Sequence, residues 1–154
     1  MYKVEQIARW FIEQADRTSG EVITHLKLQK LVYYVQAWSL ALFDEKVFEE
    51  DIQAWAHGPV SPVLYHQLKV HSYNALNEDV LQEFSSEFDE KTESLLREIK
   101  TIYGRYDAKH LEELTHQEKP WIETRNGLTS EERCEEIIPV ELMASFYKEM
   151  QSNG

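Results

Sequence analysis

The chain has 154 residues, of which 42% are hydrophobic, and it carries a formal net charge of −12. A chain of this length folds as one domain that buries roughly 70% of its unfolded surface without a metal, and the lone Cys134 excludes an internal disulfide. The negative charge disfavours direct nucleic-acid binding, because neutralising phosphates needs a positive surface. It suits a basic protein partner, although acidity also simply keeps a protein soluble. We expect one domain over residues 1–154.

Neither a membrane span nor a leader is expected. No stretch is long and apolar enough to cross a bilayer. The first residues, MYKVEQIARWF, lack the apolar run and the small-residue cleavage site of a signal peptide. Together with the lone cysteine, these features predict a cytoplasmic location.

The most strongly patterned stretch is residues 24–43, THLKLQKLVYYVQAWSLALF. Its apolar residues recur at three- and four-residue steps and extend onto the other faces, which is typical of a helix buried inside a protein. Thr24 is a residue type that caps helix starts. A membrane span is disfavoured by the polar positions His25, Lys27, Gln29, Lys30 and Gln36. The sequence therefore predicts a central buried helix around which the rest of the chain is wrapped.

The flanking stretches predict a helix, a short strand and a sharp turn. Residues 2–16 place their apolar side chains on one face, as an amphipathic helix does. Residues 48–56 alternate, which favours a short strand or extended segment. The following HGPVSP predicts a turn at Gly58 and a new helix from Pro62 to about residue 70, since proline is tolerated in a first turn.

The C-terminal half predicts three further helices. Residues 89–103 form a long amphipathic pattern, residues 108–116 a short one after Asp107, and residues 139–150 a last one opened by proline. Val80 and Leu81 are interpreted as a second short strand, and residues 126–136 as a polar segment in which Thr129 and Glu132 have capping-box spacing. The predicted fold class is mainly α: a compact single-domain helical fold around a central buried helix, with a small β-hairpin or short strand element.

The inventory of chemical groups predicts no catalytic, cofactor or metal site. The pairs His66/His71 and His110/His116 do not have the three- or four-residue spacing that places two ligands on one helical face. Ser61 does not lie in a nucleophile elbow. Cys134 forms a reactive pair with His116 only if the fold brings them together.

Two segments place a tryptophan beside a rigid turn. Trp55 runs into Gly58-Pro59, and Thr115-His116 is followed by Pro120-Trp121. Such tryptophans are either corners of the core or aromatic anchors in a binding groove, and the sequence leaves both interpretations open.

Three blocks of residues together resemble the Panacea domain, a family that includes SocA-like antitoxins and GepA-type phage-associated proteins. The blocks are Leu28-Gln29-Lys30-Leu31 with Tyr33, then Ala54-Trp55-x-x-Gly58-Pro59-Val60 with Pro62 and Tyr65, then Leu114-Thr115-His116-x-x-x-Pro120-Trp121. The resemblance implies a mostly helical, non-catalytic bacterial domain that binds and neutralises a cognate protein toxin, usually encoded in an adjacent gene.

The resemblance also directs attention to particular residues. The surface expected to bind the partner comprises Trp55, His57, Gly58, Pro59, Tyr65, Thr115, His116 and Trp121. Structural roles are expected for Leu28, Gln29, Lys30, Leu31 and Tyr33. In particular, the Lys30 amine is expected to hydrogen-bond across to the Gly58-Pro59 turn.

Two other functions stay open at this point. One is a small hydrolase or nucleic-acid-processing enzyme that uses His57 or His116 with neighbouring carboxylates. The other is an acidic phage protein that mimics nucleic acid and blocks a host factor, which predicts an ordered stripe of carboxylates. The oligomeric state is also left open.

Overall fold

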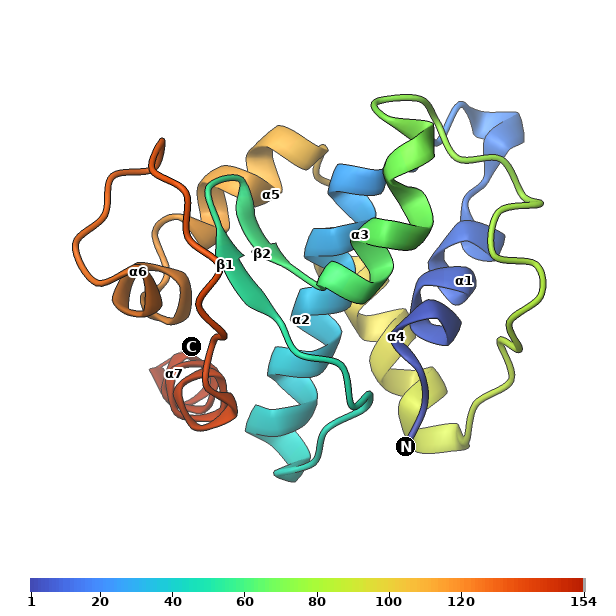
Figure 1. The fold of residues 1–154 in the computed structure, drawn as a ribbon. Helices are drawn as coiled ribbons and strands as arrows, with labels where there is room; N and C mark the ends of the chain where they lie inside the picture. Colours follow the sequence, from blue (N-terminus) through green and yellow to red (C-terminus); the bar gives the residue numbers. More distant parts are fainter. Residues whose placement is uncertain (154) are drawn as a thin grey trace.

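In the computed structural model, which describes residues 1–153, seven α-helices are arranged around one of their number (Figure 1). They are α1 (Val4–Gln14), α2 (His25–Phe43), α3 (Pro62–Leu68), α4 (Glu90–Tyr103), α5 (Ala108–Thr115), α6 (Lys119–Arg125) and α7 (Val140–Asn153). Short 3₁₀ turns follow α1 and α3, at Arg17–Ser19 and Lys69–His71. The predicted mainly helical fold class is confirmed.

Helix α2 is the central element. The Thr24 hydroxyl caps its start by accepting a hydrogen bond from the Lys27 amide at 3.3 Å, and Asp44, at a φ of 55°, ends it. Helices α1, α3, α4, α5 and α7 all pack against it. Because helices surround α2 on nearly every side, most of its apolar residues are buried, as its pattern predicts, and the exposed ones are Leu42 and Phe43 at its C-terminal end.

A two-stranded antiparallel hairpin, β1 (Gln53–Trp55) and β2 (Gly58–Val60), supplies the small β element. The chain just before α7 lies along the other edge of β1, where the Ala54 amide donates to the Glu136 carbonyl at 2.9 Å. The predicted second strand at Val80 and Leu81 is wrong. These residues lie in a turn, and Leu81 has a φ of 61°, which an extended strand does not allow. Both side chains are buried, which explains their apolar character without a strand.

Helix α6 was not expected from the sequence. It has only 7 residues and carries Pro120 in its first turn. Such a short helix contains about two turns and shows little periodicity of its own. In the polar segment that follows, the Thr129 amide donates to the Glu132 carboxylate at 3.0 Å, but this contact closes a turn and no helix follows.

A buried hydrogen-bond network joins α7 to α2. The Glu118 carboxylate, which lies just before α6, accepts hydrogen bonds from the hydroxyls of Tyr34 and Tyr147, both at 2.8 Å. The Tyr147 hydroxyl also lies 2.9 Å from that of Tyr33. Burial raises the pKa of Glu118 to about 7, the two phenol hydrogen bonds offsetting part of that effect. The network therefore connects three elements through one acidic group.

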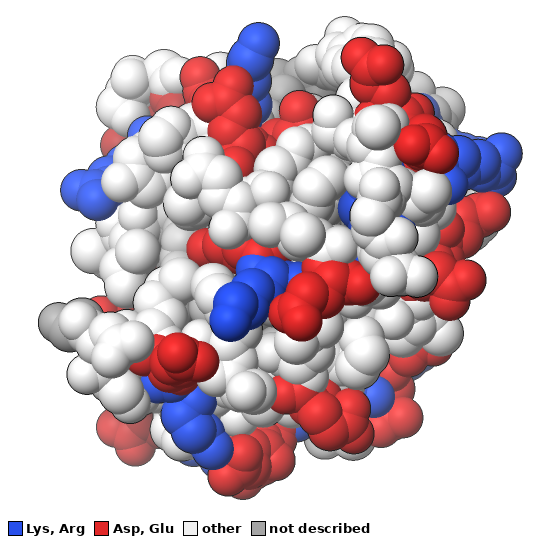
Figure 2. Space-filling view, turned by 90° about the vertical axis from the view of Figure 1, so that its left-hand side faces the viewer, with Lys and Arg blue, Asp and Glu red and all other residues white. Residues whose placement is uncertain are grey.

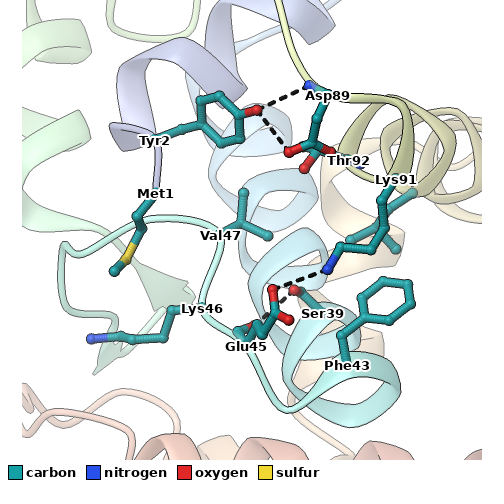
Figure 3. Close-up of a pocket in the computed structure, with 11 residues that line it drawn as sticks. Met1, Tyr2, Ser39, Phe43, Glu45, Lys46, Val47, Asp89, Lys91 and Thr92 are labelled. Carbon is teal, nitrogen blue, oxygen red and sulfur yellow. Dashed lines mark hydrogen bonds and ion pairs between the residues drawn. The ribbon is translucent and has the colours of Figure 1, made fainter.

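The first residues are tied to the body of the protein. The Tyr2 amide donates to the Val47 carbonyl at 2.8 Å, and the Tyr2 hydroxyl donates to the Asp89 carboxylate while accepting from the Asp89 amide (Figure 3). Across the described range 1–153, no helix has the length and apolar character needed to span a membrane.

Candidate functional site

The hairpin turn is shaped by Gly58. Its φ is 108°, and a Cβ atom at this position would lie 2.7 Å from Lys30 Cε and 3.0 Å from Thr115 Oγ1. Glycine is therefore required both by the backbone conformation and by the close approach of α2 and α5. Directly after β2, the Ser61 hydroxyl caps α3 by accepting from the Leu64 amide at 3.2 Å.

Polar residues of α2 hydrogen-bond to the backbone of β2 and of the residue that follows it. The Gln29 amide group accepts a hydrogen bond from the Ser61 N–H at 2.9 Å and donates one to the Ser61 carbonyl at 3.2 Å. The Lys30 amine donates to the Pro59 carbonyl at 3.4 Å, as expected from the sequence. Lys30 is fully buried, and this burial lowers the pKa of its amine to about 8. Gln36 holds the start of the same segment, since it bonds the backbone of Val47 and Phe48.

Helix α6 hydrogen-bonds to the backbone of β1. The Trp121 indole N–H donates to the Trp55 carbonyl at 2.7 Å, and the buried Arg125 guanidinium donates to the Ala54 carbonyl at 2.9 Å. The guanidinium also lies 4.7 Å from the Trp121 ring, while the His116 ring stacks on its indole at 3.9 Å. These contacts fix the position of β1 relative to α5 and α6.

Arg125 also shapes the segment that follows α6. Its guanidinium donates to the carbonyls of Thr129 and Glu132, in addition to that of Ala54. The segment is thereby drawn towards β1, where it forms one wall of an open hollow. Sequence reasoning missed Arg125, and the single available signal was its position shortly after the Pro120-Trp121 block.

This hollow lies beside the hairpin turn and has a volume of about 410 Å³. Its lining residues are Trp55, Ala56, His57, Tyr65, His66, Glu131, Arg133, Cys134 and Glu135. A second hollow shares His57 and Tyr65 and adds His25, Leu26, Lys69, Ser72 and Tyr73. We call the two together the hairpin groove. Because the two hollows share His57 of the hairpin turn and Tyr65 of α3, the groove is a continuous surface that runs from β1 to the N-terminal end of α2.

Aromatic residues form the floor of the hairpin groove. The rings of Trp55 and Tyr65 meet edge to face with centroids 4.9 Å apart, and the His25 ring lies 5.4 Å from Tyr65. Burial lowers the pKa of His25 to about 4. The His57 side chain is 80% exposed and donates from Nδ1 to the Glu112 carboxylate at 3.0 Å. The groove thus offers half-buried rings with an exposed imidazole at the centre.

The structure brings all of the sequence-predicted residues together around the hairpin, but in two roles. Trp55, His57 and Tyr65 line the open groove. Gly58, Pro59, Thr115 and Trp121 are buried beneath it, and His116 is half-buried against Trp121. The second group supports the surface without lying on it. The motif residues Leu28, Gln29, Lys30, Leu31 and Tyr33 are all buried in α2.

The groups that a catalytic function would need are only partly assembled. His57 has its carboxylate partner, Glu112. His116 is instead stacked on Trp121, and burial lowers its pKa below the ordinary value. Within residues 1–153, no hydrogen bond joins Cys134 to His116. Over the same part of the chain, no group of three His, Cys, Asp or Glu side chains is arranged to hold a metal ion.

The distribution of charge differs from a continuous acidic stripe on the face that carries α6 and α7. In Figure 2, Lys and Arg side chains stand among the Asp and Glu side chains on that face. The groove rim is also mixed, since Arg133 pairs with Glu135 at 3.3 Å.

Comparison with known proteins identifies the family. A family model described as antitoxin SocA-like, Panacea domain, matches residues 28–122, which is more than half of the 154-residue chain. The matched range runs from α2 to α6 and includes the hairpin. No curated protein and no solved structure matches the chain significantly. On the strength of that match, the chain belongs to the antitoxin SocA-like, Panacea domain family.

Proposed function

We propose that this protein binds and neutralises a cognate protein toxin, and that the hairpin groove is the surface that contacts it. Membership of an antitoxin family supports a non-enzymatic role of this kind and a toxin as partner in general. The observation that carries the choice of surface is the group of Trp55, His57 and Tyr65 in one open groove. Aromatic residues dominate the binding energy of protein interfaces when they lie in preformed pockets.

The scaffold beneath the groove favours tight binding. Gln29, Lys30, Trp121 and Arg125 hold the hairpin through its backbone. A surface that is already ordered loses little conformational entropy when a partner binds, so more of the contact energy appears as affinity. The net charge of −12 further favours a basic toxin, because opposite charges accelerate encounter. The proposal includes a cytoplasmic location and an association with phage or other mobile elements.

Co-expression tests the function itself. The chain is expressed together with the product of each neighbouring open reading frame, and growth and co-purification are scored. We expect one neighbour to be toxic alone and harmless in a co-purifying complex. A set of neighbours in which none is toxic and none co-purifies would remove the toxin-neutralising role.

Substituting a groove residue tests the surface. Tyr65→Ala removes a half-buried ring from the groove floor, and we expect affinity for the toxin to fall about tenfold or more with only a small loss of thermal stability. Phe84→Ala is the matched control, because Phe84 is also half-buried against the core but does not line the groove. Calorimetric titration and thermal melts of both variants separate binding from folding. Equal affinities in the two variants would place the interface elsewhere.

A further inference from the structure

A second groove lies at the opposite end of α2 from the hairpin groove. Its volume is about 200 Å³, and it is lined by Trp38 and Leu42 of α2, Leu95, Glu98, Ile99 and Ile102 of α4, and Gln151 of α7. In Figure 1, α4 and α7 lie on either side of the C-terminal half of α2. We call this surface the α4–α7 groove.

The floor of the α4–α7 groove is apolar apart from Glu98 and Gln151. Leu42 is 40% exposed and Ile102 is 42% exposed. The Trp38 indole N–H already donates to the Tyr103 hydroxyl at 2.9 Å, so only its ring faces a partner. The α4 residues of the groove follow a spacing of three, four and seven positions, which places them in one row along the helix. A groove of this form suits the apolar face of another helix.

On the two helices that border the groove, the basic side chains are all in ion pairs, whereas some of the acidic side chains in the part of the chain that the structure describes are not. Every Lys and Arg of α4 and α7 has an acidic partner within the chain: Lys91 with Glu45, Arg97 with Glu93, Lys100 with Glu21 and Lys148 with Asp44. Figure 3 shows the first of these pairs beside Phe43, at the end of α2. By contrast, Glu98 and Glu149 on the same two helices take part in no ion pair among the described residues. The charge left over for a partner is therefore negative.

We propose that the α4–α7 groove binds a cationic amphipathic helix of another protein. The apolar side chains of that helix contact Leu42 and Ile102, and a Lys or Arg of the helix pairs with Glu98. A second copy of this chain is disfavoured in the same groove, because it carries the same net charge of −12 and the like charges repel.

This surface is independent of the hairpin groove and does not rest on the toxin proposal. The two grooves lie at the two ends of α2, whose 19 residues span about 28 Å at 1.5 Å per residue. Over the described positions, the two grooves have no lining residue in common.

The test uses a synthetic amphipathic helix of Leu and Lys, about 18 residues long, and a twin peptide in which Glu replaces Lys. Titration of the full chain at about 50 mM salt, where surface charges are weakly screened, is expected to show binding of the Lys peptide alone. Ile102→Glu is expected to weaken this binding at least tenfold or so. Ile122→Glu is the matched control, since Ile122 is 44% exposed on α6, outside the groove, and the change in net charge is the same.

A second pair of variants isolates the charge. Glu98→Lys is expected to weaken binding of the Lys peptide about tenfold, whereas Glu113→Lys on α5, with the same charge change, has an effect of less than about threefold. Thermal melts confirm that each variant folds. Equal weakening by Ile102→Glu and Ile122→Glu, or equal binding of both peptides, would overturn the proposal. A wild-type dimer that Ile102→Glu dissociates in light-scattering measurements would replace the helix with a second copy.

Discussion

Gln29 and Gln36 explain why a helix buried on every side carries amide side chains. Each accepts a hydrogen bond from a backbone N–H and donates one to a backbone carbonyl of the segment between α2 and α3. Buried polar groups are tolerated when they are hydrogen-bonded in this way. Lys30 lies between them and has a single carbonyl partner, at 3.4 Å. Together these three side chains attach the segment that carries the hairpin to α2.

At the same scale, Glu118 is predicted to make stability depend on pH. Burial raises its pKa from an ordinary value of 4.5 to about 7, so folding favours the neutral form. The stabilisation is complete below about pH 4.5 and is lost as the pH rises through 7. We expect the contribution of Glu118 to the free energy of unfolding to fall by up to about 3 kcal/mol between pH 5 and pH 8, at 1.36 kcal/mol per pKa unit. The lowered pKa of His25 acts in the opposite direction, because folding disfavours its charged form and this group therefore costs stability as the pH falls.

Denaturant titrations at several pH values measure this effect. In Glu118→Gln the side chain is always neutral, so the change in the free energy of unfolding from pH 5 to pH 8 should be more positive than in the wild type by up to about 3 kcal/mol. Glu113→Gln, on the exposed side of α5, should keep the wild-type slope. If Glu118→Gln retained the full slope, another group would be responsible.

At the scale of elements, the hairpin depends on the close contact between Gly58, α2 and α5. Gly58→Ala should destabilise the protein by roughly 3 kcal/mol, because the backbone has a φ of 108° there and the new methyl group meets Lys30 Cε at 2.7 Å and Thr115 Oγ1 at 3.0 Å. Equilibrium unfolding gives the loss directly.

Gly127→Ala provides the comparison. Gly127 also has a positive φ, of 86°, but no atom lies within 4 Å of the position of an added Cβ. Backbone strain alone should cost roughly 1 kcal/mol there. The difference between the two variants is the contribution of the packed contact, and a difference near zero would show that the hairpin moves away from α2 at little cost.

At the scale of the whole molecule, the net charge of −12 predicts a dependence on salt. Mutual repulsion destabilises the folded state, and salt screens it over a Debye length that falls from about 30 Å at 0.01 M to about 10 Å at 0.1 M. We expect the melting temperature to rise by about 2–5 °C between 0.01 and 0.3 M sodium chloride. A scanning calorimeter series measures it.

Surface ion pairs act in the opposite direction, because salt weakens them, but their effect on the melting temperature is small. Ion pairs on the surface, such as Lys91 with Glu45 and Lys148 with Asp44, weaken with salt, but exposed pairs are each worth about 0–1 kcal/mol. A melting temperature that falls with salt would mean that these pairs outweigh the net repulsion.

The sequence by itself determined the features that depend on near neighbours. The spacing of apolar residues predicted the buried α2, and Thr24, Asp89 and Asp107 cap helices where the pattern starts. Periodicity and capping depend on residues three or four positions apart, so the local sequence is enough to predict them. The motif blocks likewise indicate the family without the structure.

The tertiary structure alone decided the features that join distant residues. The second strand is Gly58–Val60 and not Val80–Leu81, because its pairing depends on the contacts of Gly58 with α2 and α5. Arg125 reaches the Ala54 carbonyl across 71 positions of the chain, and Tyr34 reaches Glu118 across 84. The division of the predicted site into an exposed surface and a buried support follows from the same long-range packing, for which a linear pattern has no signal.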